Sequence, residues 1–322
     1  MKFVQNLKEK VLSGGYINKD EALQLANADL EALCSAADEI RSVFCQNGFD
    51  ICTIINGKSG KCTENCKYCA QAGCHATSAA EYPLLETKQL LEEARHNEKQ
   101  GVLRYSIVTS GRRLSPKEVE LACESIKTIK HETNIEVCAS FGLLEEEDFK
   151  KLKEAGVSRI HNNLESSRRY FPEVCTTHTY RDKITAIQAA QKAGLSVCSG
   201  GIMGIGETME DRIDMALELR ALEIRSVPVN MLNPIPGTPL ADQKILSEDE
   251  MRRIIAIYRF ILPQASIRMA GGRGLLEDKG MKCFQSGANA AISGDMLTTS
   301  GITVAKDLEM LEQLGYVPRL SE

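Results

Sequence analysis

Residues 50–69 read DICTIINGKSGKCTENCKYC, an apolar run followed by a loop that carries three thiols. Cys62, Cys66 and Cys69 follow one another at spacings of four and three residues. A structural zinc site usually closes with four ligands, often as two Cys-x2-Cys pairs, so this triplet matches zinc poorly. Three thiolates on one short loop suit three corners of a four-iron cluster and leave the fourth iron open. The plain alternatives are a zinc knuckle or three unrelated buried cysteines.

Outward from this stretch, short apolar runs alternate with longer amphipathic segments about eight times. We predict strands at residues 50–55, 103–109, 135–140, 159–164, 196–203, 226–231, 266–270 and 290–293. Between them we predict helices that include residues 87–99, 145–155, 180–193, 209–222 and 248–262. Repeated βα units of this length predict an α/β fold, a (βα)8 barrel of the TIM type, with an open doubly wound sheet as the alternative.

The two ends of the chain differ from this pattern. Residues 1–45 predict an N-terminal helical extension, since leucines recur there at helical spacing, and residues 46–322 predict the barrel domain. Residues 301–322 predict a last helix and a polar tail. In a barrel of this kind the chemistry collects at the C-terminal ends of the strands. The thiol loop follows the first predicted strand and therefore belongs to that end.

Composition narrows the classes of function. The chain has 322 residues, 43% of them hydrophobic, and a formal net charge of −5, which gives no reason to expect nucleic acid or an anionic membrane as a partner. No stretch approaches the roughly 20 apolar residues of a membrane span, and the N-terminus lacks the apolar core of a signal peptide. We therefore predict a cytoplasmic protein. In that setting its twelve cysteines point to metal ligation and buried thiols rather than disulfides.

Several residues in or after the predicted strands are unusual for a purely structural barrel. They are Cys138, Asn163, Cys198, Asn230 and Arg268. A strand cysteine is usually only a small buried hydrophobe, and Asn230 also reads as a turn residue at a strand end. Arg268 is harder to explain, because its charge cannot be buried without a partner.

The spacing of the thiol triplet, with Tyr68 just before its third cysteine, resembles the cluster loop of the radical S-adenosylmethionine (SAM) enzymes. Four further motifs resemble the biotin synthase family within that superfamily, and they are VCSGGIMGIGET at 197–208, SVPVNML at 226–232, GTPLA at 237–241 and SGANA at 286–290. The resemblance runs from about residue 50 to the end. It implies a homodimeric barrel that inserts sulfur between C6 and C9 of dethiobiotin, using radicals made from SAM and sulfur from an auxiliary iron–sulfur cluster.

The resemblance also implies roles for individual residues. Cys62, Cys66 and Cys69 would hold a [4Fe–4S] cluster. Asn163 and Glu165 fall where the family contacts the SAM ribose, Asn163 and Asn230 where it binds the ureido ring of dethiobiotin, and Ile202 and Tyr68 where the adenine lies. An Asn amide offers a donor and an acceptor without charge, which suits a urea. The implied partners are dethiobiotin, an electron donor such as flavodoxin or ferredoxin, and the iron–sulfur assembly machinery.

The chain departs from the family at the auxiliary cluster. In the family this is a [2Fe–2S] cluster held by three strand cysteines and an arginine, of which Cys138, Cys198 and Arg268 match. Ser106 stands where the remaining cysteine is expected, and serine is a much harder and more basic ligand than thiolate. Our hypothesis is that Cys74 joins Cys138 and Cys198 around a four-iron cluster with an extra sulfide. Arg268 would then be a hydrogen-bond donor, and an idle exposed Cys74 is the alternative.

A second departure concerns the SAM carboxylate, for which either Lys183, at the family's arginine position, or the displaced Arg181 would serve. We interpret Cys283 as structural. We interpret Cys34, Cys45, Cys52, Cys123 and Cys175 as buried or incidental thiols. Two functions remain open beside sulfur insertion. One is another radical SAM barrel enzyme, such as a methylornithine synthase or a diiron-site maturase, and the other is a metal-binding scaffold without activity.

Overall fold

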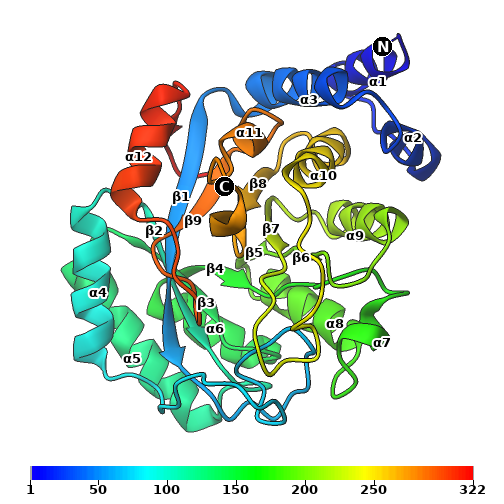
Figure 1. The fold of residues 1–322 in the computed structure, drawn as a ribbon. Coiled ribbons are helices and arrows are strands. Elements are labelled where there is room, and N and C mark those ends of the chain that lie inside the picture. Colours follow the sequence, from blue (N-terminus) through cyan, green and yellow to red (C-terminus); the bar gives the residue numbers. More distant parts are fainter. Residues whose placement is uncertain (1, 322) are drawn as a thin grey trace.

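A computed structural model describes residues 2–321, and its centre is one closed parallel sheet (Figure 1). The strands are β1 (Gly48–Lys58), β2 (Arg104–Thr109), β3 (Glu136–Ser140), β4 (Val157–His161), β5 (Ser196–Cys198), β6 (Gly201–Met203), β7 (Ser226–Met231), β8 (Ser266–Met269) and β9 (Ala290–Ser293). They pair in sequence order, except that β5 and β6 each pair with β7 and not with each other, and β9 pairs back onto β1. The (βα)8 barrel is thereby confirmed, and the open sheet is excluded.

One predicted strand, 196–203, is interrupted in the structure. β5 pairs with β4 and β6 with β7, so the two pieces share one position in the barrel with a break at Ser199 and Gly200. A Cβ on Gly200 would lie 1.9 Å from the carbonyl oxygen of Pro228, and one on Gly201 would lie 2.5 Å from that of Glu165. The two glycines are therefore required by the close approach of backbone from β7 on one side and from the segment after β4 on the other.

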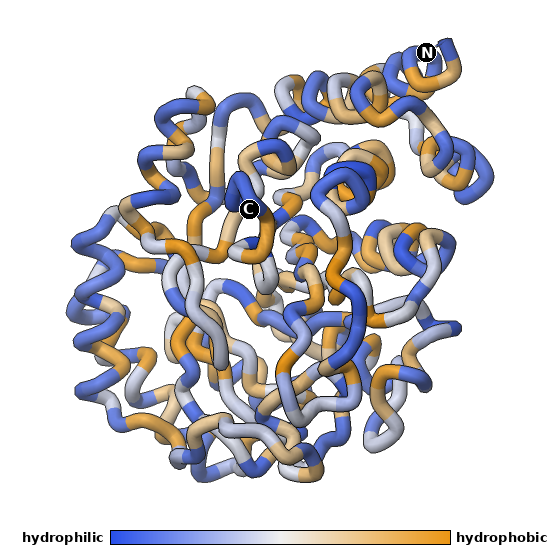
Figure 2. The backbone as a smooth tube through the Cα atoms, in the orientation of Figure 1, coloured by the Kyte–Doolittle hydropathy of each residue, from blue (hydrophilic) through white to orange (hydrophobic). Residues whose placement is uncertain are grey.

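The strands are connected by helices on the outside of the barrel, with apolar faces turned inward (Figures 1 and 2). These are α4 (Thr87–Lys99), α5 (Pro116–Glu132), α6 (Glu146–Ala155), α8 (Tyr180–Lys192), α9 (Met209–Ala221) and α10 (Glu248–Ile261), with short α7 (Phe171–Val174), η1 (Arg273–Leu275) and α11 (Met281–Phe284) in loops. Helix α5 was not among the helices named from the sequence. Its start is nonetheless marked, since Ser115 and Glu118 form a capping box around Pro116.

The N-terminal helices α1 (Lys2–Leu12), α2 (Lys19–Leu25) and α3 (Leu30–Cys45) precede the first strand, in agreement with the helical pattern of the sequence. Helix α3 packs along α10, and α2 contacts α9, so the three helices cover one side of the barrel's outer layer (Figure 1). Their buried side chains belong to the same apolar core as those of the barrel. The separation into an extension and a barrel domain stays a prediction.

The C-terminal segment differs from the predicted polar tail. After α12 (Val304–Gln313), the short strand β10 (Val317–Pro318) pairs with the start of β1. Ser321 then enters the base of the barrel, where its hydroxyl donates to Asp50 and its carbonyl accepts from Arg159. The segment up to Ser321 therefore closes the N-terminal end of the barrel, while Glu322 lies outside the described residues.

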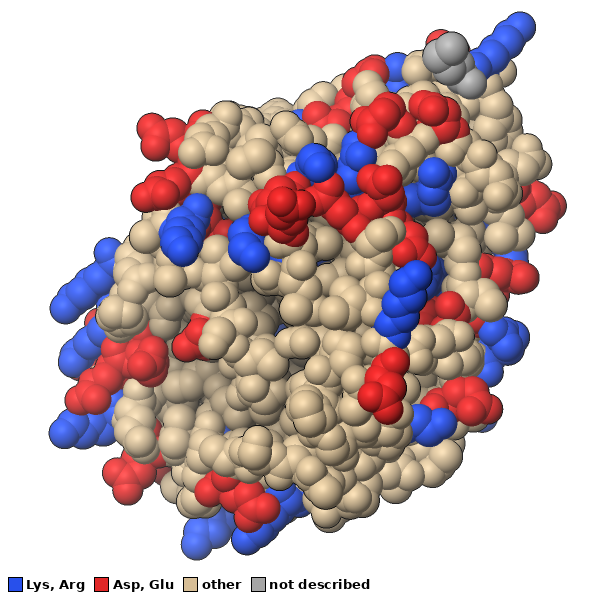
Figure 3. All heavy atoms as spheres, viewed as in Figure 1, with Lys and Arg blue, Asp and Glu red and all other residues tan. Residues whose placement is uncertain are grey.

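Charged side chains of both signs are interspersed on the face drawn in Figure 3, and its middle carries few of them. This agrees with the modest net charge of the chain. Within residues 2–321, the helices are too short or too polar to cross a lipid bilayer.

Candidate functional site

A cavity of about 400 Å³ opens at the C-terminal end of the barrel and reaches down its axis. Its lining includes the thiol triplet at the mouth, the inward-facing side chains of the strands, and the loops that follow β1, β4 and β7. This is the end of a (βα)8 barrel at which catalytic groups gather. The volume is in the range of small-molecule sites.

The three thiols of the mouth lie on a loop that is held by its own backbone. The amide of Cys62 donates to the carbonyl of Gln71 (3.1 Å), and the amide of Gly73 donates back to the carbonyl of Cys62 (2.8 Å). Cys62, Cys66 and Cys69 are all partly exposed and line the cavity. Three accessible thiols on a constrained loop that line one cavity are compatible with a cluster that has one open iron.

Asn65 fastens this loop to the segment after α7. Its side-chain oxygen accepts from the amides of Thr176 (3.0 Å) and Thr177 (3.3 Å), and its amide nitrogen donates to the hydroxyl of Thr176 (2.6 Å). One asparagine therefore joins two loops that are more than a hundred residues apart in the sequence.

Two residues near the triplet were not predicted to belong to the site. The sulfur of Cys175 and a ring nitrogen of His178 lie within 4.8 Å of the sulfur of Cys66 and of each other. Glu64, also on the cluster loop, hydrogen-bonds to His178, and all of these side chains except Cys66 are buried. Cys175 is buried, one of the two alternatives that the sequence gives for it, and the sequence offers no signal for this contact because it joins separate loops.

On the other side of the mouth, Asn163 and Glu165 follow β4. Glu165 has a φ of +69°, the left-handed region that non-glycine residues rarely adopt and that is enriched at functional sites. Its backbone is fixed by bonds to Gly200 (3.0 Å) and Ile202 (2.9 Å), and its carboxylate accepts from the Asn163 amide (3.3 Å). Both side chains line the cavity, next to each other as the predicted ribose contact requires.

The predicted adenine contacts also meet. Tyr68 and Ile202 pack against the same small apolar cluster, which is centred on Val174, Ile205 and Leu232. Both side chains line the cavity. Burial raises the pKa of Tyr68 well above its usual range, so the ring stays neutral. An apolar wall with one neutral phenol suits an aromatic base.

Asn230, at the end of β7, faces into the cavity and bridges two backbone segments. Its nitrogen donates to the carbonyl of Gly201 (3.1 Å), and its oxygen accepts from the amide of Gly271 (2.9 Å). An Asn side chain has a second N–H and a second lone pair, and neither is used by these two hydrogen bonds. The bridge fixes the amide so that the remaining donor and acceptor point in set directions.

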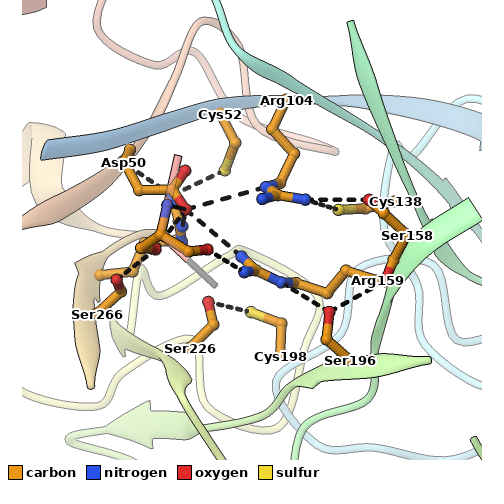
Figure 4. Close-up of polar contacts among 12 residues, drawn as sticks. Asp50, Cys52, Arg104, Cys138, Ser158, Arg159, Ser196, Cys198, Ser226 and Ser266 are labelled. Atoms are coloured by element: carbon orange, nitrogen blue, oxygen red, sulfur yellow. Dashed lines mark hydrogen bonds and ion pairs between the residues drawn. The ribbon is translucent and has the colours of Figure 1, made fainter. Parts of the chain in front are cut away.

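A second group of thiols lies deeper, on the strands themselves (Figure 4). Cys52 on β1, Cys138 on β3 and Cys198 on β5 are all buried and all line the cavity. Each sulfur accepts a hydrogen bond. Arg268 donates to Cys52 (3.1 Å), Arg104 donates to Cys138 (3.8 Å) and Ser226 donates to Cys198 (3.2 Å). We call this level, formed by the three thiols and the arginines around them, the lower chamber.

Three arginines of the lower chamber share one carboxylate. Asp50 lies 3.9 Å from Arg104, 3.5 Å from Arg159 and 3.2 Å from Arg268, and each of the four side chains is at most 5% exposed. Burial raises the pKa of Asp50, but the three guanidinium charges more than offset this and hold it at about 2. The carboxylate is therefore ionised, and two of the three positive charges in this group remain unbalanced.

The charges of the lower chamber act differently on its thiols. Burial raises the pKa of Cys52 to about 12 and also raises that of Cys138, each against the opposing effect of nearby arginines. For Cys198, burial is outweighed by contact with His161 and by the charges of Arg268 and Arg159, so its pKa falls to about 6. A metal with affinity for thiolate would bind such a set by displacing the protons of Cys52 and Cys138.

The donor set fits an anionic iron–sulfur cluster at this depth. Arg104 Nε and Arg268 Nη2 are buried beside the Asp50 carboxylate (3.9 and 3.2 Å), but neither forms a well-aligned hydrogen bond with it or with another described residue. Buried guanidinium donors normally find acceptors. An anionic cluster ligated by these thiols would give the guanidinium donors the acceptors they require. An apolar barrel interior would not.

At two places the structure favours one of the alternatives that the sequence leaves open, and at a third it adds a residue to the site. Cys74 is exposed, contacts His75 (3.5 Å) and lies outside the described cavity lining, so the structure does not bring it to Cys138 and Cys198. Arg181 is exposed as well, whereas Lys183 lines the cavity and donates to Asn162 (3.3 Å). Cys52, interpreted from the sequence as a buried or incidental thiol, is buried and belongs to the lower chamber.

Ser106 lies where the missing cysteine was expected. It lines the cavity on β2, directly across from Cys138 on β3 and from Ile54 on β1. Cys52 is one inward-facing position below Ile54. The alternation of side chains along β1 was the signal that would have pointed to it, because positions 50, 52 and 54 share one face.

Comparisons with known proteins agree with this geometry. Residues 58–219 match the Radical SAM superfamily, and residues 228–317 match the Biotin and Thiamin Synthesis associated domain. The chain is 60% identical over 319 residues to the biotin synthase of Brachyspira hyodysenteriae, covering 99% of this chain and 96% of that one. It is 56% identical over 320 residues to that of Akkermansia muciniphila, covering 99% and 100%.

Solved structures are similar in fold at much lower identity. A methylornithine synthase superposes with a TM-score of 0.84 at 20% identity, covering 98% of this chain and 97% of that one. The FeFe-hydrogenase maturase HydG from Carboxydothermus hydrogenoformans gives 0.84 at 16% identity, covering 99% and 80%. These structural similarities establish only the barrel fold. The family is established by the sequence identity of more than 50% over nearly the whole chain. The chain belongs to the biotin synthase family of radical SAM enzymes.

Proposed function

We propose that this protein converts dethiobiotin to biotin by inserting one sulfur atom between C6 and C9. One observation supports this above all: a single cavity is lined by a thiol triplet at its mouth and a second group of three thiols below it. Asn163 follows His161 by two residues and Asn230 follows Ser226 by four, and His161 and Ser226 are the residues that pair with Cys198, so both amides lie toward the mouth from that thiol. A substrate held by the amides would have a radical source above it and a sulfur source below.

The residues of the mouth would bind SAM. Cys62, Cys66 and Cys69 would hold the [4Fe–4S] cluster, while Asn163 and Glu165 would accept the ribose hydroxyls, and Lys183 would pair with the carboxylate. When bound, the [4Fe–4S] cluster supplies the electron that cleaves SAM to a 5′-deoxyadenosyl radical, and the auxiliary cluster supplies the sulfur.

The middle of the cavity would orient dethiobiotin. The free donor and acceptor of Asn230 match a ureido ring, and neutral amides bind it without placing a charge beside a carbon radical. The loops that follow β1, β4 and β7 surround this level, and they would keep water from it. Orientation matters here because the same sulfur must reach two carbons in turn.

At the lower level, Cys138 and Cys198 would be ligands of the auxiliary cluster. They lie on β3 and β5 with their side chains in one cavity. Their neighbours Arg104, Arg159 and Arg268 would stabilise its negative charge. A homodimer, a flavodoxin- or ferredoxin-type electron donor, help from assembly proteins and a cytoplasmic location stay predictions for this chain.

Anaerobic reconstitution tests the proposal. Iron and sulfide per chain are measured with a Mössbauer spectrum, and SAM, reductant and dethiobiotin are then added. We expect biotin and 5′-deoxyadenosine, with about eight irons if both clusters have four and about six if the auxiliary cluster has two. About four irons and 5′-deoxyadenosine without biotin would overturn the proposal in favour of another radical SAM reaction.

A further inference from the structure

We propose that four side chains at the mouth of the barrel bind a single divalent metal ion, with Zn²⁺ as the ion that suits them best, in the protein that has not yet received its [4Fe–4S] cluster. They are Glu64, Cys66, Cys175 and His178. This inference goes beyond the proposed function and does not depend on it. The site shares one sulfur, that of Cys66, with the thiol triplet.

The spacing of the ligand atoms suits a tetrahedral ion. The sulfurs of Cys66 and Cys175 and a ring nitrogen of His178 all lie within 4.8 Å of one another, and the Cys175 sulfur is 3.3 Å from Nδ1 of His178. Around one tetrahedral zinc, with bonds of about 2.3 Å to sulfur and about 2.0 Å to nitrogen, neighbouring ligand atoms lie about 3.5–3.8 Å apart. The three atoms are therefore grouped close to the separations that one ion requires.

Glu64 supplies a fourth ligand. Its carboxylate hydrogen-bonds to Nδ1 of His178, the same nitrogen that contacts the sulfur of Cys175. The side chains of Glu64 and His178 are only 8% and 5% exposed, so water competes little for them. Two thiolates, one imidazole and one carboxylate make a closed set of four ligands, which is the usual coordination number of zinc in a structural site. An ion at this point would replace the protons that join these groups.

Hydrogen bonds within the protein do not fully satisfy His178. Its Nε2 is buried and has no hydrogen-bond partner among residues 2–321. Buried polar atoms are nearly always paired, and an exception calls for an ion, a ligand or a water. A histidine that only packed between two loops would have no reason to keep this nitrogen unpaired, whereas a neutral imidazole can bind a metal through either nitrogen.

The two loops that carry the ligands are joined by the residues between those ligands. Asn65 stands between the two ligands of the first loop, and its side chain hydrogen-bonds to Thr176 and Thr177, which stand between the two ligands of the second. This contact holds both pairs of ligands face to face before any ion binds. Ligands that are fixed in advance lose little conformational freedom on binding, which favours affinity.

The ion and the [4Fe–4S] cluster exclude each other, because both require the sulfur of Cys66. A tetrahedral ion that holds this sulfur beside Cys175 leaves only Cys62 and Cys69 for the cluster. Zn²⁺ generally binds a given set of sulfur, nitrogen and oxygen ligands more tightly than Fe²⁺ does. Zinc at this site should therefore keep the protein free of its cluster, and assembly of the mouth should be sensitive to zinc.

Zinc binding to the cluster-free, full-length chain tests the site. Zn²⁺ is added anaerobically at one equivalent per chain, and X-ray absorption spectroscopy counts the atoms around it. We expect two sulfurs at about 2.3 Å and two nitrogen or oxygen atoms at about 2.0–2.2 Å. Failure to bind, or any other number of sulfurs, would overturn the proposal, and three sulfurs would place the ion on the triplet or in the lower chamber. Because the chain is unsubstituted, this measurement does not depend on the folding of a variant.

Three variants locate the ion. Cys175→Ala should weaken zinc binding, measured in competition with a chelator, by more than about a hundredfold, since losing a ligand costs more than losing a residue that only supports one. Cys62→Ala disrupts the triplet and Cys138→Ala the lower chamber. These two matched controls should bind zinc within about twofold of the wild type. Unchanged affinity in Cys175→Ala, or a large loss in either control, would contradict the assignment.

Iron uptake tests the competition between the ion and the cluster. A wild-type protein loaded with zinc should take up less iron during reconstitution than the zinc-free protein, and it should form less 5′-deoxyadenosine. Cys175→Ala should take up the same iron with and without zinc, because Cys175 is not part of the triplet. Zinc that lowered the iron of both proteins equally would be bound by the triplet itself, and the proposal would be wrong. Biotin formation by the zinc-free wild type is measured separately, so the proposed function and this inference can fail independently.

Discussion

The thiols at the mouth of the barrel and those of the lower chamber differ in what holds them. Cys62, Cys66 and Cys69 lie on a loop and are partly exposed, whereas Cys52, Cys138 and Cys198 lie on strands and are buried. A loop at the cavity entrance can leave an iron accessible to an incoming cosubstrate. Ligands on strands hold a cluster in a fixed place with little access to solvent. With the roles proposed for the two groups, one cavity would separate radical generation from sulfur supply by depth.

The sharpest test of that separation removes one thiol from the mouth. We expect Cys69→Ala to reduce the formation of 5′-deoxyadenosine and of biotin to background, because the cluster that delivers the electron loses a ligand. The auxiliary iron should remain and be visible by Mössbauer spectroscopy. Substantial SAM cleavage by this variant would show that the mouth triplet is not the radical source.

The converse variant removes a thiol from the chamber. Cys198→Ala should still cleave SAM, since the mouth is intact, but it should make no biotin because the sulfur source is lost. The measurement is the ratio of biotin to 5′-deoxyadenosine in one reaction. Biotin formation near the wild-type level would break the comparison, because sulfur would then come from elsewhere.

The mouth and the chamber were not equally predictable from the sequence. Three cysteines at fixed spacing identify the mouth without any fold, since the whole pattern lies on one loop. The chamber combines residues from β1, β2, β3, β4, β5 and β8, and only closure of the barrel brings them together. The local sequence marks Cys138, Cys198 and Arg268 as unusual strand residues, but only the family resemblance assigns them to an auxiliary cluster.

Cys52 and Cys74 show why the rest of the lower chamber could not be predicted from the sequence. Cys74 is close in sequence to the triplet, but a bond between the Gly73 amide and the Cys62 carbonyl turns the loop back, and the thiol ends on the surface. Cys52 sits in an apolar run, where a thiol resembles any small hydrophobe. The alternation of side chains along β1 shows that Cys52 faces the barrel interior. The function of that face, however, depends on arginines from three other strands.

A third prediction concerns the charge that distinguishes the chamber from the mouth. Asp50→Asn leaves three buried guanidinium groups without a carboxylate, and we expect a loss of about 3–5 kcal/mol of stability. Anaerobic melting of the reconstituted protein should therefore move down by at least about 6 °C. As a control, Glu31→Gln removes a 74% exposed carboxylate from an ion pair with Arg252 and should change stability by less than about 1 kcal/mol. Equal shifts for the two variants would mean that the chamber is not an electrostatically strained region.

The smallest effect is expected at the partly solvated side of the mouth, where two basic residues compete for the SAM carboxylate. Lys183 lines the cavity and Arg181 is exposed, so Lys183→Met should raise the KM for SAM about tenfold to a hundredfold, as the loss of one charge-assisted hydrogen bond predicts. Its kcat should change little, because the group binds SAM without taking part in its cleavage. Arg181→Met is the matched control and should leave the KM within about twofold.

The salt dependence of these two variants sharpens the comparison further. Because Lys183 is only partly buried, its contribution should shrink as ionic strength rises, and the KM of the wild type should approach that of Lys183→Met. The ratio of biotin to 5′-deoxyadenosine should stay constant over the same range, since the buried arginines of the chamber are screened far less. If added salt changed that ratio as strongly as the KM, the chamber would be open to solvent and the two levels of the cavity would not be separate. If Arg181→Met rather than Lys183→Met raised the KM, the carboxylate partner would lie on the outer rim, and SAM would bind less deeply than the cavity lining implies.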